Sequence, residues 1–137
     1  MKLYHFTSKH HIRSALKDGL TLGCIPLSLD PPELIKGYQW LTRNSSFDQS
    51  WCGHSSLPYN RNDYRIQLAI PKKYQKNLHK WLPCGKIWSS FKNLSAHGDP
   101  ENWYLYNGFI IPKWFKKIKG NPGAADLRTS IHLTADL

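Results

Sequence analysis

The feature that most constrains the fold is the run from Asn102 to Phe115, the densest set of aromatic and β-branched residues in the chain. Such side chains favour strands, because they pack well on a pleated, half-buried surface. We expect two strands, Trp103 to Tyr106 and Phe109 to Ile111, around an Asn107-Gly108 turn, since Asn-Gly accepts the positive φ angles of a tight hairpin. Glu101, one of two glutamates in the chain, stands directly in front. A carboxylate at the mouth of a buried hairpin is the first candidate functional group.

Three earlier segments also predict strands, because apolar and polar residues alternate along them. They are Lys2 to Phe6, Gly37 to Thr42 and Tyr64 to Ile70. The segment from Thr21 to Leu29 contains a proline, which predicts an edge strand or a loop. The following stretch from Arg43 to Asn62 is rich in Ser, Asn, Gly and Pro and is expected to form a long loop.

Two segments predict helices. The first runs from Lys9 to Lys17, with Ser8 as its N-cap and Gly19 as the left-handed residue after its end. The second runs from about Lys72 to Leu82 and is opened by a proline at its first position. The segment from 87 to 94 is ambiguous between a short helix and irregular structure. Together these elements predict one α+β domain over residues 1–120, with a split, largely antiparallel β-sheet core and two or three short helices. Residues 121–137 are expected to form a flexible tail with weak strand character at 130–133.

The composition points to a polyanionic partner. The net charge is +10 and the pI about 9.7, which favours nucleic acid, a nucleotide or an acidic protein as a ligand. Cys24, Cys52 and Cys84 lack the spacing of a zinc site, so no metal is expected and free thiols are the default. No apolar run is long enough to span a membrane and no leader is apparent. We therefore expect a cytoplasmic protein with no membrane partner.

Three patches of the sequence carry a resemblance to a known family. Leu3-Tyr4-His5-Phe6-Thr7-Ser8, followed by a helix ending in Asp18-Gly19-Leu20, resembles the opening of ADP-ribosyltransferases of the diphtheria-toxin and poly-ADP-ribose-polymerase clan. Gly37-Tyr38-Gln39-Trp40-Leu41-Thr42 resembles their second strand, where an aromatic residue packs on nicotinamide. Glu101 before an aromatic strand resembles their catalytic glutamate. The pattern is also similar to that of small bacterial and phage proteins.

The resemblance implies an NAD pocket and a mono-ADP-ribosyltransferase that modifies a protein or a nucleic acid. Glu101 would be catalytic and bind the 2′-hydroxyl of the nicotinamide ribose. The implied NAD-binding residues are His5 for the adenosine ribose, the backbone near Phe6 and Thr7 for the carboxamide, Trp40 for stacking, and Thr42 after it. The family has Gly where Phe6 stands and Tyr where Trp40 stands. Asp99 occupies the place of the additional acid that arginine-modifying toxins carry.

Elementary chemistry makes these residue types suitable for that reaction. Cleaving a nicotinamide–ribose bond develops positive charge on the sugar, as in glycoside hydrolysis. A nearby carboxylate stabilises this charge as it forms, and a planar aromatic side chain holds the neutral leaving group by stacking. A basic surface attracts the diphosphate. Arg13, Arg43 and Arg65 are the candidates for that contact.

Two other functions fit the sequence. A small, basic, toxin-like ribonuclease would use His5, His79 or His97 as acid and base, since such catalysis needs two groups that titrate near neutrality. A non-catalytic module would bind nucleic acid or an acidic protein through charge alone, and its affinity would fall steeply with salt. Loss of Glu101 would leave a ribonuclease largely intact and would abolish the transferase.

Overall fold

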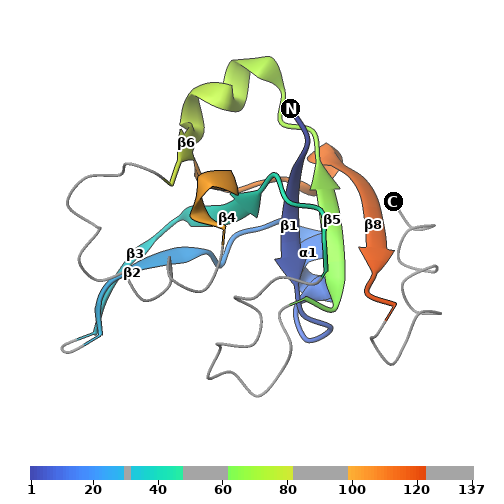
Figure 1. Ribbon diagram of the computed structural model, residues 1–137, viewed down its shortest axis with the longest axis horizontal. Coiled ribbons are helices and arrows are strands. Elements are labelled where there is room, and N and C mark those ends of the chain that lie inside the picture. The colour runs from blue at the N-terminus through green and yellow to red at the C-terminus, as the bar shows by residue number, and fades with distance from the viewer. Residues whose placement is uncertain (30–31, 48–61, 82–98, 123–137) are drawn as a thin grey trace.

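The fold is built around a six-stranded antiparallel sheet with the strand order β6-β7-β4-β1-β5-β8 (Figure 1). The computed structural model describes residues 1–29, 32–47, 62–81 and 99–122. The strands of this sheet are β1 (Leu3–Thr7), β4 (Tyr38–Thr42), β5 (Tyr64–Leu68), β6 (Leu78–Lys80), β7 (Trp103–Asn107) and β8 (Phe115–Gly120). A separate two-stranded sheet pairs β2 (Cys24–Leu29) with β3 (Pro32–Lys36) and extends to one side as an arm (Figure 1).

The unit formed by β1 and α1 (Ile12–Asp18) closely follows the prediction. Ser8 starts the helical turn, because its carbonyl accepts the backbone N–H of Ile12 at 3.0 Å and its hydroxyl accepts that of His11 at 3.2 Å. The helix proper therefore begins three residues after the expected start at Lys9. Gly19 ends it with φ +85° and ψ −168°. This positive φ is accessible to glycine without steric cost, although the ψ differs from that of the predicted left-handed helical cap.

The main hydrophobic core lies between α1 and one face of the sheet. Ile12 and Ala15 of the helix are buried together with Ile66 of β5 and Ile118 of β8, and Ile66 is 0% exposed. The register places Leu3 opposite Leu68 and pairs Ile66 with Ile118, so these side chains share one face. Burying this apolar area is the dominant stabilising term for a domain of this size.

A one-pair junction divides the sheet into two halves. β1 and β4 are in register only at Tyr4 and Thr42, whereas β1 with β5 and β4 with β7 each pair over five positions. The expectation of an α+β protein with a largely antiparallel sheet and few helices is confirmed. Helix α1 lies behind β1 and β5, and the turn η4 (Pro100–Asn102) lies in front of β4 (Figure 1).

The predicted hairpin at 103–111 is wrong in its second strand. β7 forms as expected, but its two neighbours are β4 and β6, so neither edge is left for residues 109–111. Ile110 instead exchanges two backbone hydrogen bonds with Leu20, of 2.8 and 3.1 Å. Gly108 does adopt positive φ, at +130°, and its N–H donates to the carbonyl of Gly37 at 2.7 Å. The Asn-Gly signal thus marked a change of direction and not a hairpin.

The predicted helix at 72–82 is also wrong. Residues Lys72–Asn77 form a short 3₁₀ helix, η2, and the chain then becomes extended as β6. Leu78 pairs with Tyr106 and Lys80 with Tyr104, because the edge of β7 offers unpaired backbone groups to this segment. Residue 82 and the segment 87–94 lie outside the described residues.

Two further strands, β3 and β8, were not predicted from the sequence, and β8 shows why. The sequence indicated only a basic cluster at 116–119 and a linker beginning at Gly120. In the structure the segment pairs with β5, and a register shift at Gln67 and Leu68 leaves Lys116 as an extra residue. This bulge interrupts the alternation of buried and exposed side chains, which is why a period of two is not visible in the sequence. The tail at 123–137 lies outside the described residues.

Candidate functional site

His5 connects the two halves of the sheet where their pairing stops. Its Nδ1 atom lies 2.7 Å from the backbone oxygen of Trp40. Because a carbonyl oxygen only accepts, Nδ1 must carry the proton, which fixes the tautomer of the neutral ring. Tyr4, one residue before His5, and Thr42, two residues after Trp40, form the only β1–β4 pair in the described register. The histidine thus extends the contact between the strands by means of a side chain.

Trp40 is half-buried and belongs to a tryptophan cluster made of Trp40, Trp81 and Trp103. Its ring centroid lies 5.0 Å from that of Trp81 and 5.9 Å from that of Trp103. Both partners are buried, and the backbone N–H of Trp81 donates to the carbonyl of Trp103 at 3.0 Å. The rigid backing orients the indole of Trp40, as a stacking platform for a planar ligand requires.

Glu101 lies in the turn η4 immediately before β7, and its side chain is exposed. The turn is attached to the end of β4, because the backbone N–H of Arg43 donates to the carbonyl of Asn102 at 3.0 Å. One residue back along β4, Thr42 pairs with Trp103. The candidate glutamate therefore stands beside the end of the strand that carries Trp40. Figure 1 shows its turn in front of β4, on the opposite side of the sheet from α1.

A network centred on Asp99 holds this turn in place. One carboxylate oxygen of Asp99 accepts the side-chain amides of Asn44 and Asn102, at 2.9 and 3.0 Å, and the other accepts the indole N–H of Trp103 at 3.2 Å. The hydroxyl of Thr42 enters the same network by accepting the N–H of Asn44 at 3.0 Å. Asp99 thus acts as a structural acceptor for the turn, although its position in the sequence is that of the additional acid of arginine-modifying toxins.

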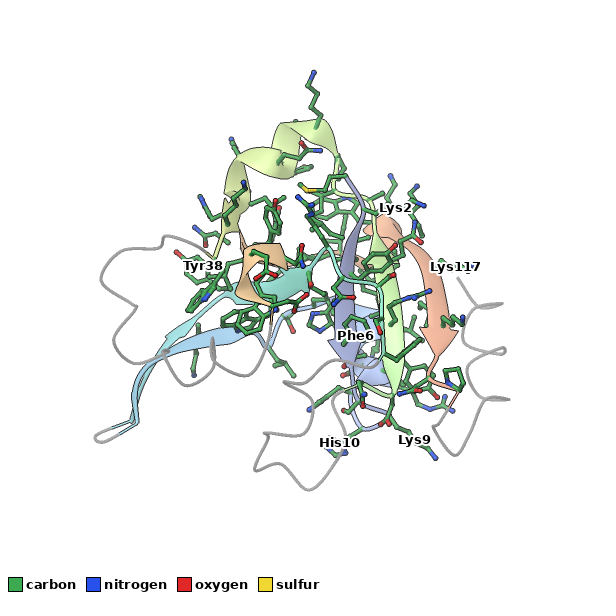
Figure 2. All side chains as sticks on the ribbon, viewed as in Figure 1. Lys2, Phe6, Lys9, His10, Tyr38 and Lys117 are labelled. Atoms are coloured by element: carbon green, nitrogen blue, oxygen red, sulfur yellow. The ribbon has the colours of Figure 1, made fainter. Side chains whose placement is uncertain are left out.

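Phe6 and Thr7 are placed differently from the other candidates. Both side chains are buried, and the ring of Phe6 packs edge-to-face on Phe47 with centroids 5.6 Å apart. Figure 2 labels Phe6 on β1, beneath the segment that follows β4. Thr7 pairs with Tyr64 at the end of the strand. Their side chains therefore serve packing, and a contact from these positions to a ligand would be made through the backbone.

The three candidate arginines are separated by the fold. Arg13 is exposed on α1, across the sheet from η4. Arg65 is engaged on β5, where its guanidinium lies over the rings of Tyr4 and Phe47 and donates to the carbonyl of Ser45 at 2.7 Å. Arg43 is exposed, and its backbone N–H donates to the carbonyl of Asn102, so the fold attaches it to the turn that carries the glutamate.

The structure separates two of the histidines that a ribonuclease would use. His5 lies on β1 and His79 on β6, with β4 and β7 between them. Three strand spacings place their backbones about 14 Å apart. The register also puts His79 on the face of Trp40 and His5 on the face of the core residue Ile66, so the two side chains do not converge on one phosphodiester. His97 lies outside the described residues.

His11, just before α1, has a perturbed titration. Burial, and to a lesser degree the charge of His10, lower its pKa from the ordinary value.

Sequence reasoning did not assign Trp81 to the site, and it gave Asp99 only the place of the additional acid that arginine-modifying toxins carry. Trp81 falls within the predicted helix at 72–82, and it joins the tryptophan cluster because β6 replaces the second half of that helix. Asp99 had a visible signal, since it stands four residues before an indole donor. Among the described residues, no group of three or more His, Cys, Asp or Glu side chains could hold a metal ion. No helix within the described ranges has the length and apolarity needed to cross a membrane.

The chain matches no protein-family model, no curated protein and no solved structure.

Proposed function

We propose that this protein is an NAD-dependent mono-ADP-ribosyltransferase, with Glu101 as its catalytic residue. The observation that carries the proposal is the meeting of three distant sequence patches on three adjacent strands. β1 brings His5, β4 brings Trp40, and the turn before β7 brings Glu101. A hydrogen bond from His5 to the Trp40 carbonyl connects β1 with β4. A second, from the backbone N–H of Arg43 to the Asn102 carbonyl, connects the end of β4 with the turn before β7.

Each side chain supports one part of NAD recognition. Trp40 is half-exposed and backed by Trp81, so its indole can receive nicotinamide with little loss of conformational freedom. The Nδ1–H of His5 donates to the Trp40 carbonyl, and the register pairs His5 with the core residue Ile66 on the α1 face of the sheet. The support that His5 gives to NAD recognition would therefore act through the backbone of Trp40. The hydroxyl of Thr42 accepts a backbone N–H within the Asp99 network, which assigns it to supporting the strand end beside the ring.

The reaction follows from these placements. The C–N bond between ribose and nicotinamide breaks, and its electron pair leaves with the neutral pyridine. Positive charge builds on the ribose, where the carboxylate of Glu101 stabilises it. A nucleophilic atom of the acceptor then attacks the anomeric carbon and loses its proton. Arg43, exposed beside the same turn, is the best-placed cation for the diphosphate.

The test compares wild type with Glu101→Gln in label transfer from labelled NAD to a cell lysate. This substitution keeps the size of the side chain and removes its charge. We expect transfer to fall by about 10²–10³-fold, the usual effect of losing one electrostatic stabiliser. Asp18→Asn is the matched control, because it removes a carboxylate exposed at the end of α1 and should leave transfer unchanged.

Two further measurements make the test decisive. NAD should raise the melting temperature of wild type, and Trp40→Ala should reduce that rise, because stacking on the ring is lost. Absence of label transfer, of nicotinamide release and of any NAD-induced stabilisation would refute the proposal. A nuclease activity that survives Glu101→Gln would favour the ribonuclease instead.

A further inference from the structure

A basic surface lies on the face of β5 and β8 that points away from α1. Arg65 pairs with Lys119 and Gln67 with Lys117, so these four side chains share one face. Ile118, between the two lysines, is buried in the core on the other face. Both lysines are exposed, while Arg65 and Gln67 are half-buried. We call these four residues the β5–β8 face, and Figure 2 labels Lys117 at this edge of the sheet.

The charge of this face is not balanced within the sheet. None of the six strands of the main sheet, all within the described residues, contains an aspartate or a glutamate. Arg65 and Lys119 are cross-strand partners, but the guanidinium of Arg65 lies over the rings of Tyr4 and Phe47 and donates to the carbonyl of Ser45. The accessible charge of the face is therefore that of the two exposed lysines. Lysines on an edge strand also discourage pairing with other chains, and an anionic ligand would neutralise them.

The spacing of the lysines suits a repeating anion. Alternate residues of a strand lie about 6–7 Å apart on one face, and neighbouring strands about 5 Å apart. Lys117 and Lys119 thus place two positive charges one such interval apart, and Gln67 beside them adds a neutral donor and acceptor. A nucleic-acid backbone presents phosphates at regular intervals along its length, whereas an acidic protein surface presents carboxylates at irregular positions.

The face lies on the same side of the sheet as the turn that carries Glu101. The register runs from Lys117 to Gln67, from Gln67 to Tyr4, from Tyr4 to Thr42 and from Thr42 to Trp103, a row of five strands about 19 Å from end to end. Tyr4, Thr42 and Trp103 are buried, so a polymer bound at the lysines would reach the glutamate, two residues before Trp103, by passing over the segments that cover this row.

We propose that the β5–β8 face binds the phosphate backbone of nucleic acid. The further statement that this nucleic acid is the acceptor of ADP-ribose rests on the proposed function.

The experiment measures binding of fluorescently labelled single-stranded and duplex oligonucleotides by anisotropy, without NAD, over a range of salt concentrations. The test variant is Lys117→Gln/Lys119→Gln. The control is Lys17→Gln/Lys113→Gln, which removes the same charge from exposed positions on α1 and on η5 (Pro112–Trp114), an element that packs against α1. Size-exclusion chromatography and thermal melting establish that both variants remain folded and monodisperse.

We expect the test variant to lose two phosphate contacts. The slope of log affinity against log salt should become shallower by about 1.4 for a single strand or about 1.8 for a duplex. The control should keep the wild-type slope. A label-transfer assay with the preferred oligonucleotide and NAD then asks whether the bound polymer is modified. Binding that depends on the two lysines, with no transfer, would preserve this inference and count against the proposed function.

Three outcomes would overturn the inference. An equal change of slope in both variants would mean that overall charge, and not this face, attracts the ligand. Unchanged binding in the test variant, with self-association appearing, would mean that the lysines only protect the sheet edge. Competition by polyglutamate at the same charge concentration as the oligonucleotide would identify an acidic protein as the preferred partner.

Discussion

Removing the carboxylate of Asp99 should destabilise the turn that carries the candidate glutamate. Asp99 accepts three side-chain hydrogen bonds, from Asn44, Asn102 and Trp103. At a net contribution of about 0.5–1.5 kcal/mol for each bond, Asp99→Ala should lower the free energy of unfolding by roughly 2–4 kcal/mol. Values in the lower part of this range apply to hydrogen bonds whose donors water can reach, because water then replaces the carboxylate as acceptor.

The conservative variant gives the prediction its specificity. The amide of Asp99→Asn has one acceptor oxygen, which can still serve the two asparagine donors, while its NH₂ group then faces the indole N–H of Trp103. The variant should lose one bond and gain a donor–donor contact, so we expect a cost of about 1–2 kcal/mol. The order of stability should be wild type, then Asp99→Asn, then Asp99→Ala.

The assay is urea denaturation followed by tryptophan fluorescence, because Trp103 is itself one of the donors. Asp18→Ala is the control, since this exposed carboxylate at the end of α1 should change stability by less than about 0.5 kcal/mol. Label transfer should fall in the same order as stability if Asp99 positions Glu101. An Asp99→Ala variant as stable as the control would refute the reasoning, because the network would then contribute nothing to the folded state.

Three further perturbations test other parts of the fold. Gly19→Ala should lower the free energy of unfolding, measured by urea denaturation, by about 1–3 kcal/mol or more. The reason is that φ is +85° and an added Cβ would meet the Ile110 carbonyl oxygen. Unchanged stability would contradict this. Gln39→Met should lower the free energy of unfolding by about 2–4 kcal/mol. The buried amide of Gln39 donates to one backbone carbonyl and accepts from one backbone N–H, and both hydrogen bonds would be lost. A neutral effect would show that neither hydrogen bond stabilises the fold. The lowered pKa of His11 means that the unfolded chain binds more protons below its ordinary pKa of about 6.5. Stability is therefore fully present above that pH and is lost as pH falls through the lowered value. His11→Gln should reduce the acid-induced fall in melting temperature, and the exposed His79→Gln should not; equal profiles would count against the assignment.

Local signals in the sequence were sufficient for the first strand and helix. The signals there are the alternation at Lys2 to Phe6, the hydroxyl of Ser8 and the glycine at position 19. Each acts on residues close to it in the sequence, so the structure it favours can be predicted without knowing which distant segment packs against it. The same holds for β4, β5 and β7, whose apolar residues alternate or cluster clearly. The overall class followed from the order of these elements, and the six candidate residues were chosen from the same local motifs and their resemblance.

The remaining elements depended on partners far away in the sequence. Residues 109–111 carry a good strand signal, but only the occupied edges of β7 decide that Ile110 pairs with Leu20. The segment at 78–80 has a helical pattern of apolar residues, and the backbone groups along β7 make it a strand. In β8 the bulge at Lys116 interrupts the alternation of buried and exposed side chains, so the sequence of this strand does not show a period of two. Backbone hydrogen bonding between strands is a property of the assembled sheet, and no single segment encodes it.

For the candidate site, too, some features followed from the sequence and others only from the tertiary structure. The sequence by itself determined which residue types were present, namely a histidine on the first strand, a tryptophan on another, and a glutamate before an aromatic strand. Only the tertiary structure decided that these strands are neighbours, that His5 reaches the carbonyl of Trp40, and that Asp99 orders the turn before β7. The reason is physical: hydrogen bonds and ring contacts act over a few ångströms, and folding alone brings residues 5, 40 and 101 onto adjacent strands.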